Sequence, residues 1–182
     1  MGFQEDWVPK VTREAMCRLL AHAAKVGLAN TDECTLRAFF MAAAHDLVDP
    51  SPRLQTEWRR FDLLLQNNGL ATVIEFKYYM RRRSLGLQGE HIGFKGGPGP
   101  KNEAEFKACV EKLRTAAIPG VADRRLILVY ERQPNSGSRY SFSQSYQDLT
   151  VGTDLADVQA LQVDQLEARV LRPCWVESPP PP

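Results

Sequence analysis

Apolar and polar positions in the first fifty residues recur with the spacing of two amphipathic helices. The first helix is expected over residues 9–26, where a glycine ends it. The second is expected to begin near Asn30, whose side chain can cap the free amides, with Glu33 three residues later as its capping-box partner. The prolines from Pro50 onward would end this helix.

The pattern then changes to short runs typical of strands, expected over residues 54–58, 59–66 and 70–79. Asn68-Gly69 lies between the last two runs. This dipeptide is the strongest short hairpin signal, because a type I′ turn needs positive φ at both central residues. We therefore expect an antiparallel meander of three strands.

The second half of the chain is less regular. The Gly- and Pro-rich residues 86–101 predict a mobile loop, and residues 102–117 predict a third helix. A buried strand is expected over 125–131 and a fourth helix over 154–170. This order predicts a mixed α/β fold, with a small mixed central sheet flanked by helices. Residues 1–176 would form one domain, and 177–182 a disordered Pro-rich tail.

Composition narrows the class of protein. The 182 residues are 43% hydrophobic and 25% charged, which is typical of a globular domain and excludes a largely disordered chain or a coiled coil. No apolar run approaches the roughly 18 residues of a transmembrane helix, so no membrane partner is expected. The four cysteines form no CxxC pair and no export signal is seen, which favours reduced thiols and a cytoplasmic location.

The predicted hairpin brings charged residues together. If Asn68-Gly69 is the turn, Asp62 lies opposite Glu75, and Arg60 lies opposite Lys77. The same register places Phe61 opposite Phe76, on an apolar face with Leu63, Leu65 and Ile74. Two carboxylates about 5 Å apart repel by about 3 kcal/mol at an effective dielectric of 20.

A divalent cation between the two carboxylates would turn this repulsion into a binding site, and Lys77 would point the same way as Glu75. Two acids, a lysine and a metal ion suffice for phosphodiester hydrolysis. The spacing equally allows a second interpretation. Asp62 and Glu75 could be solvated, each forming a cross-strand ion pair with Arg60 or Lys77.

The segments FDLLL (61–65) and VIEFK (73–77), joined by a short turn, resemble the PD-(D/E)xK nuclease superfamily. The resemblance implies the restriction-endonuclease-like core and hydrolysis of nucleic acid, with DNA favoured. It implies that Asp62 and Glu75 bind Mg²⁺ or Mn²⁺, that the main-chain carbonyl of Phe76 is a further ligand, and that Lys77 is catalytic.

Many family members add a glutamate from the helix before the sheet, and Glu33 is the candidate here, with helix capping as its alternative role. The run TEWRRFDLLL also resembles the E-x-n-GR-x-D segment of nuclease domains that accompany some bacterial ATPases, which would place Glu57 and Arg60 beside the site. This sequence departs from that pattern, because Arg59 stands where the family has glycine.

Basic residues bracket the hairpin and suit contacts with phosphates, or form an ordinary solvated charge run. The candidates for nucleic-acid binding are Arg59, Arg60, Arg81, Arg82, Arg83, Lys95 and Lys101. Because many relatives cut both strands as dimers, a homodimer is a further partner that the resemblance suggests. The alternative function is a non-catalytic module that keeps the fold and binds nucleic acid or a protein. An enzyme acting on RNA or a nucleotide is a third option.

Overall fold

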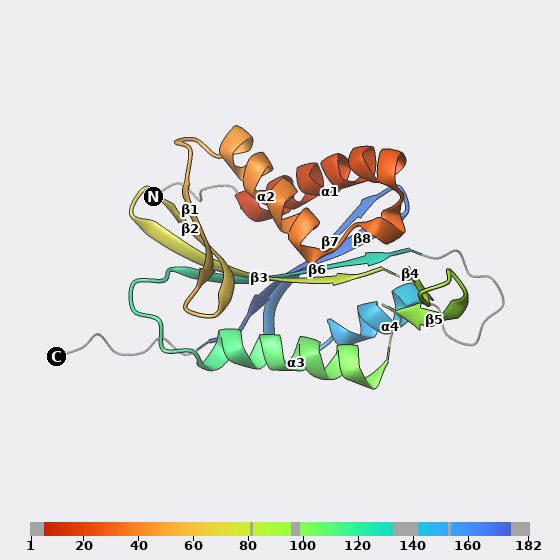
Figure 1. Ribbon diagram of the computed structural model, residues 1–182. Coiled ribbons are helices and arrows are strands. Elements are labelled where there is room, and N and C mark those ends of the chain that lie inside the picture. Colours follow the sequence, from red (N-terminus) through yellow and green to blue (C-terminus); the bar gives the residue numbers. More distant parts are fainter. Residues whose placement is uncertain (1–5, 81, 96–98, 133–141, 153, 176–182) are drawn as a thin grey trace.

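The computed structural model describes residues 6–80, 82–95, 99–132, 142–152 and 154–175. It is a mixed α/β fold in which a six-stranded sheet lies between two layers of helices (Figure 1). The predicted tail, residues 177–182, lies outside the described residues.

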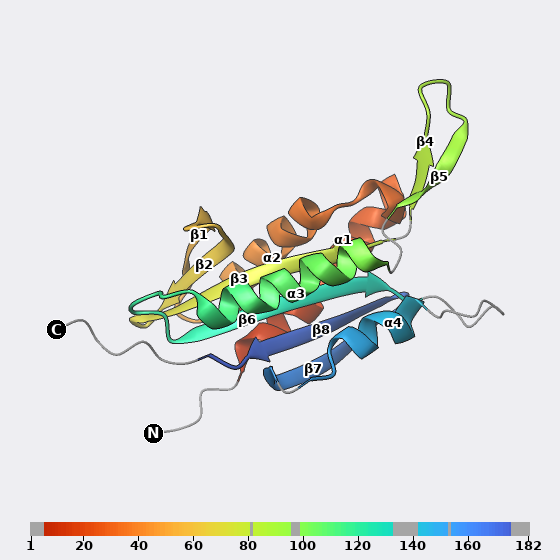
Figure 2. The same ribbon diagram turned by 90° about the horizontal axis from the view of Figure 1, so that it is seen from below.

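The helices are α1 (Trp7–Val26), a short 3₁₀ helix η1 (Leu28–Asn30), α2 (Glu33–Leu47), α3 (Pro100–Thr115) and α4 (Phe142–Leu149). The strands of the large sheet are β1 (Arg53–Trp58), β2 (Phe61–Asn67), β3 (Leu70–Tyr79), β6 (Asp123–Glu131), β7 (Leu155–Val163) and β8 (Leu166–Pro173). Two further strands, β4 (Arg82–Leu85) and β5 (His91–Lys95), pair only with each other and project away from the body of the molecule (Figure 2).

The strand order in the large sheet is β1-β2-β3-β6-β8-β7. β3 and β6 are parallel, and all other neighbours are antiparallel. The predicted meander is confirmed, and so is its turn: φ is 49° at Asn68 and 76° at Gly69. The predicted register is confirmed from Asn67↔Leu70 to Leu63↔Ile74.

Helices α1 and α2 cover one face of the sheet, and α3 and α4 cover the other (Figure 1). Each face packs its own hydrophobic cluster. Leu63, Leu65, Ile74 and Phe76 belong to the cluster beneath α1 and α2, as the alternation predicts. The prediction for Phe61 is wrong, because its side chain joins the α3 cluster on the opposite face. The regular β2–β3 register therefore does not continue past Leu63.

The start of the second helix also differs from the prediction. Asn30 lies in η1, and its side chain donates to the Val26 carbonyl at the end of α1. Asp32 is the N-cap of α2, and its carboxylate accepts from the Thr35 main-chain N–H at 2.8 Å. Glu33 is consequently the first residue of α2 and is not the partner in a capping box centred on Asn30.

Two segments of the second half were predicted wrongly. Residues 154–170 form most of the β7–β8 hairpin instead of a helix. Residues 86–101, predicted as a loop, include β5 and the first two residues of α3, which begins at Pro100, while residues 96–98 lie outside the described residues. The third helix and the strand near 125–131 are confirmed as α3 and β6.

Among the described residues, no helix combines the length and the apolar character that crossing a bilayer requires.

Candidate functional site

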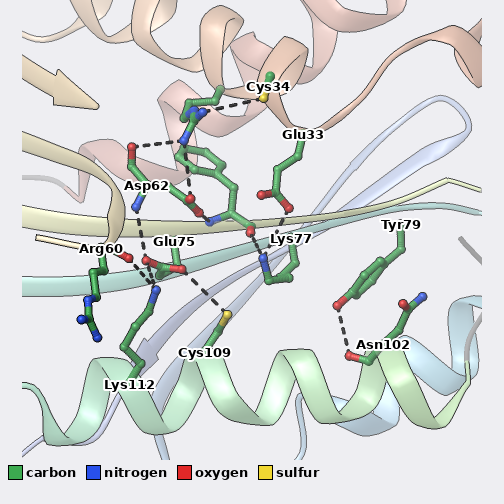
Figure 3. A network of polar contacts seen from close by, with 12 residues as sticks. Glu33, Cys34, Arg60, Asp62, Glu75, Lys77, Tyr79, Asn102, Cys109 and Lys112 are labelled. Carbon is green, nitrogen blue, oxygen red and sulfur yellow. Dashed lines mark hydrogen bonds and ion pairs between the residues drawn. The ribbon is translucent and has the colours of Figure 1, made fainter. Parts of the chain in front are cut away.

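Where Asp62 and Glu75 meet, main-chain N–H groups of β2 and β3 donate to side-chain carboxylates instead of to main-chain carbonyls of the other strand. The Phe76 main-chain N–H donates to Asp62 Oδ2 at 2.7 Å, and the Asp62 main-chain N–H donates to Glu75 Oε1 at 3.2 Å. These two bonds link the acidic residue of β2 to the carboxyl-terminal half of β3 (Figure 3). The structure thus brings Asp62, Glu75 and the main chain of Phe76 together.

Glu75 is almost completely buried, with 2% of the residue exposed, and it faces α3. Its Oε1 lies 2.6 Å from Lys112 Nζ, and its Oε2 lies 3.8 Å from the Cys109 thiol, which donates to it. Burial raises the pKa of Glu75, and the hydrogen bond from Lys112 opposes that rise. Burial also raises the pKa of Cys109 to about 11, so this thiol remains protonated and donates.

Asp62 is approached from the opposite layer of helices. Arg37 of α2 places Nη1 3.5 Å from Asp62 Oδ1 and 3.4 Å from the Asp62 carbonyl. The same guanidinium is ion-paired with Glu57 of β1. Arg37 therefore joins the acidic residue of β2 to the glutamate that the sequence placed beside the site.

Lys77 lies between Glu33 and the main chain of its own strand. Its Nζ donates to the Phe76 carbonyl at 2.9 Å and lies 3.5 Å from Glu33 Oε2 (Figure 3). Burial lowers the pKa of Lys77, but the surrounding carboxylates, Glu33 foremost, outweigh burial and leave this pKa above its usual value. Burial raises the pKa of Glu33, while the charge of Lys77 acts against it.

A cleft of about 360 Å³ opens beside the Glu33–Lys77 pair. Glu33 and Lys77 are accessible from this cleft, whereas Glu75 lies deeper beneath α3. The residues lining the cleft are Thr31, Asp32, Glu33, Cys34, Lys77, Tyr78, Met80 and Glu105.

The partners of the two acidic residues differ from the ion pairs considered from spacing. Arg60 does not lie opposite Lys77, because Arg59 and Arg60 form the two-residue turn between β1 and β2, with φ of 47° and 73°. The acidic residues pair instead with Arg37 and Lys112, on helices packed against opposite faces of the sheet. Sequence reasoning missed Arg37 and did not connect Cys109 or Lys112 with Glu75.

The sequence offers only weak indications that these residues contact the two acidic residues. Arg37 adjoins Leu36 and lies four positions after Glu33 on α2. Cys109 and Lys112 flank the buried Val110 on α3, three residues apart, a spacing that places them on neighbouring turns.

The residues predicted to bind nucleic acid are spread over several elements. Arg59 and Arg60 are exposed, and the Arg59 guanidinium lies 5.0 Å from the Trp58 ring centre. Lys101 is on α3, with 88% of its side chain exposed. Arg82, Arg83 and Lys95 belong to the projecting β4–β5 hairpin, and Arg81 lies outside the described residues.

The group at Asp62 and Glu75 offers oxygen ligands to a cation. Two carboxylates and the Phe76 carbonyl are the hard donors that Mg²⁺ and Mn²⁺ prefer, so the residues present fit such an ion. Within the part of the chain that the structure describes, no three His, Cys, Asp or Glu side chains converge as a metal-binding group. The main-chain carbonyl would therefore be needed as the third protein ligand.

Comparisons with known proteins identify no relative: no family model, no curated protein and no solved structure matches this chain significantly.

Proposed function

We propose that this protein is a metal-dependent nuclease that hydrolyses phosphodiester bonds of nucleic acid, with DNA as the favoured substrate. The observation that carries the proposal is the single polar network that joins Asp62, Glu75 and Lys77 across β2 and β3. An acidic residue on one strand and an ExK segment on the next are the pattern of the PD-(D/E)xK superfamily.

The arrangement of elements supports the same proposal. A helix precedes a three-stranded antiparallel meander, and a helix then leads into β6, which lies parallel to β3. This is the order expected of a restriction-endonuclease-like core, and it places the acidic residues on neighbouring strands near the centre of the sheet.

In the proposed site, Asp62, Glu75 and the Phe76 carbonyl would hold Mg²⁺ or Mn²⁺. When bound, the cation would supply Lewis-acid activation of the phosphodiester. Lys77 has a raised pKa, so at neutral pH its ammonium stays charged. Its role is then to orient water and to offset negative charge on the pentacovalent phosphate, rather than to remove a proton. Glu33 would hold the Lys77 ammonium in place from α2.

The test is to incubate supercoiled and linear DNA with the protein in Mg²⁺, Mn²⁺ or EDTA, beside the variant Lys77→Ala. We expect cleavage only with a divalent cation and a loss of at least about 100-fold in the variant. Lys107→Ala is the matched control, because Lys107 is an exposed lysine on α3 paired with Glu103. Parallel reactions with single-stranded DNA and RNA identify the substrate.

One observation favours the alternative of a non-catalytic binding module. Each acidic residue of the pair already has a cationic partner from the protein, Arg37 for Asp62 and Lys112 for Glu75. Such a site is electrically balanced without a metal ion. Binding of DNA without cleavage under every condition above would support the module and contradict the nuclease.

A further inference from the structure

Lys112 of α3 reaches the most deeply buried acidic group of the candidate site. Its Nζ lies 2.6 Å from Glu75 Oε1 and donates to the Arg60 carbonyl at 2.9 Å. The ammonium also lies 5.1 Å from the Phe61 ring centre, within the range of a cation–π contact. Figure 3 shows it approaching Glu75 from the α3 side of the sheet.

This ammonium neutralises a carboxylate that has almost no access to water. Glu75 is 2% exposed, and a buried ionised group without a partner is strongly unfavourable. Apart from Lys112, the groups that donate to this carboxylate in the part of the chain that the structure describes are the Asp62 main-chain N–H and the Cys109 thiol, both uncharged. Lys112 thus supplies the positive charge directly bonded to this carboxylate.

A divalent cation bound between Asp62 and Glu75 would bind the oxygen atoms of the Glu75 carboxylate, whose negative charge Lys112 already neutralises. Two cations cannot both occupy one carboxylate without repulsion, because their charges would lie only a few ångströms apart. Lys112 has 34% of its side chain exposed, and its flexible four-carbon stem allows the ammonium to move into water. The buried carboxylate has no comparable freedom.

We propose that Lys112 competes with a divalent cation for Glu75, so that the cation binds only as the lysine ammonium is displaced. This inference rests on the proposed metal-dependent function and adds a determinant of cation affinity that the family resemblance does not supply. Lys112 acts here as a positioning residue, holding Glu75 charged and in place until the exchange.

Mn²⁺ binding to the metal-free protein, measured by isothermal titration calorimetry, tests the competition. We expect Lys112→Met to bind Mn²⁺ about tenfold tighter than the wild type, because a charge-assisted hydrogen bond no longer has to be broken. Lys112→Arg retains the charge and should bind with close to wild-type affinity. Lys107→Met, on the same helix, should leave the affinity unchanged. Titrations at pH 7 and pH 8 check that a proton on Glu75 does not replace the lost ammonium.

A second measurement uses the unmodified chain and stays informative if Lys112→Met fails to fold. Lysine acylation, quantified by mass spectrometry, reports how free each ammonium is. Labelling of Lys112 should rise when Mg²⁺ is added, whereas labelling of Lys107 should not change.

The outcomes separate this inference from the proposed function. Cation binding that requires Asp62, but is equally tight in wild type and Lys112→Met and leaves Lys112 labelling unchanged, overturns the competition and keeps the nuclease. Absence of Mn²⁺ and Mg²⁺ binding in every variant overturns both.

Discussion

Glu75 is a buried acidic residue whose surroundings destabilise its charged form. Burial raises its pKa despite the hydrogen bond from Lys112, so the protein around it disfavours the charged form. Shifted pKa values of this kind are frequent at binding and catalytic sites.

The pH dependence of stability follows from this shift. The folded protein holds the Glu75 proton more tightly than the unfolded chain, whose pKa is near 4.5. The resulting stabilisation is complete below that pH and is lost as the pH rises through the raised folded-state pKa. We expect Glu75→Gln, whose amide stays neutral, to be more stable than the wild type by about 1 kcal/mol at pH 8. Near pH 4 the difference should vanish.

Urea unfolding at pH 4, 6 and 8 with EDTA present measures this difference. Comparing the two proteins at each pH cancels the titration of all other groups. A variant that is less stable than the wild type at pH 8 would contradict the assignment of burial as the dominant cause.

Only the part of the site built on one hairpin could be predicted from the sequence. The two-residue turn and the alternation along the strands predicted that Asp62, Glu75 and Lys77 lie together, although the regular register ends at Leu63 and side-chain bonds join Asp62 to β3. Arg37 and Lys112 could not be found in this way, because they reach the site from helices on opposite faces of the sheet. Strand register relates residues within the hairpin but says nothing about residues on helices packed against it.

In the β7–β8 hairpin, pairing with neighbouring strands overrode the local preference for a helix. Residues 154–170 are rich in Ala, Leu and Gln, which favour helices when considered alone. Yet β8 is paired on both sides, with β6 and with β7, and is buried along most of its length. A strand of this kind lacks the alternation that identifies an exposed strand. A local feature that indicates a hairpin is Asp164, which has a φ of 47° in the tight turn between β7 and β8.

The N-cap of α2 fixes the position of Glu33, the first residue of the helix, and its contribution to stability can be tested. Asp32 accepts bonds from both the main-chain N–H and the hydroxyl of Thr35, each at 2.8 Å. We expect Asp32→Ala to lower the free energy of unfolding by about 1 kcal/mol, because the first turn loses its cap. Asp32→Asn preserves the cap and should change stability by a few tenths of a kcal/mol at most.

Chemical denaturation of the three proteins at neutral pH measures the effect. If Asp32→Asn is as destabilised as Asp32→Ala, the charge of Asp32 and not its capping bond stabilises the helix start.

The order of the strands in the sheet decides which elements surround the candidate site. The β3–β6 parallel pairing centres β3 in the sheet, with helices on both faces, and so buries Glu75. The sequence predicted the antiparallel meander because its strands are joined by short turns. It could not predict the β3–β6 pairing, because 43 residues separate the end of β3 (Tyr79) from the start of β6 (Asp123).

The balance of charges at the candidate site suggests that a divalent cation would stabilise the folded protein. Glu33, Asp62 and Glu75 pair with Lys77, Arg37 and Lys112, so these six charges cancel, and the formal net charge of the whole chain is only +1. A bound divalent cation would add two positive charges to this group and make it better suited to a phosphodiester. Because the unfolded chain lacks this arrangement of ligands, binding should stabilise the fold by about 2.7 kcal/mol at a concentration of about 100 times Kd.

That gain corresponds to a rise in Tm of roughly 5 to 10 °C for a chain of this length. Thermal unfolding in MgCl₂, in KCl of equal ionic strength and in MgCl₂ with excess EDTA separates specific binding from a general salt effect. Asp62→Asn should lose the rise in Tm, because one carboxylate ligand is gone. Asp46→Asn should keep it, because Asp46 lies on the exposed side of α2 and pairs with Arg18. An equal rise in KCl would show a general salt effect and no specific binding. An unchanged rise in Asp62→Asn would place the cation elsewhere. Either result would remove the physical basis for the proposed hydrolysis.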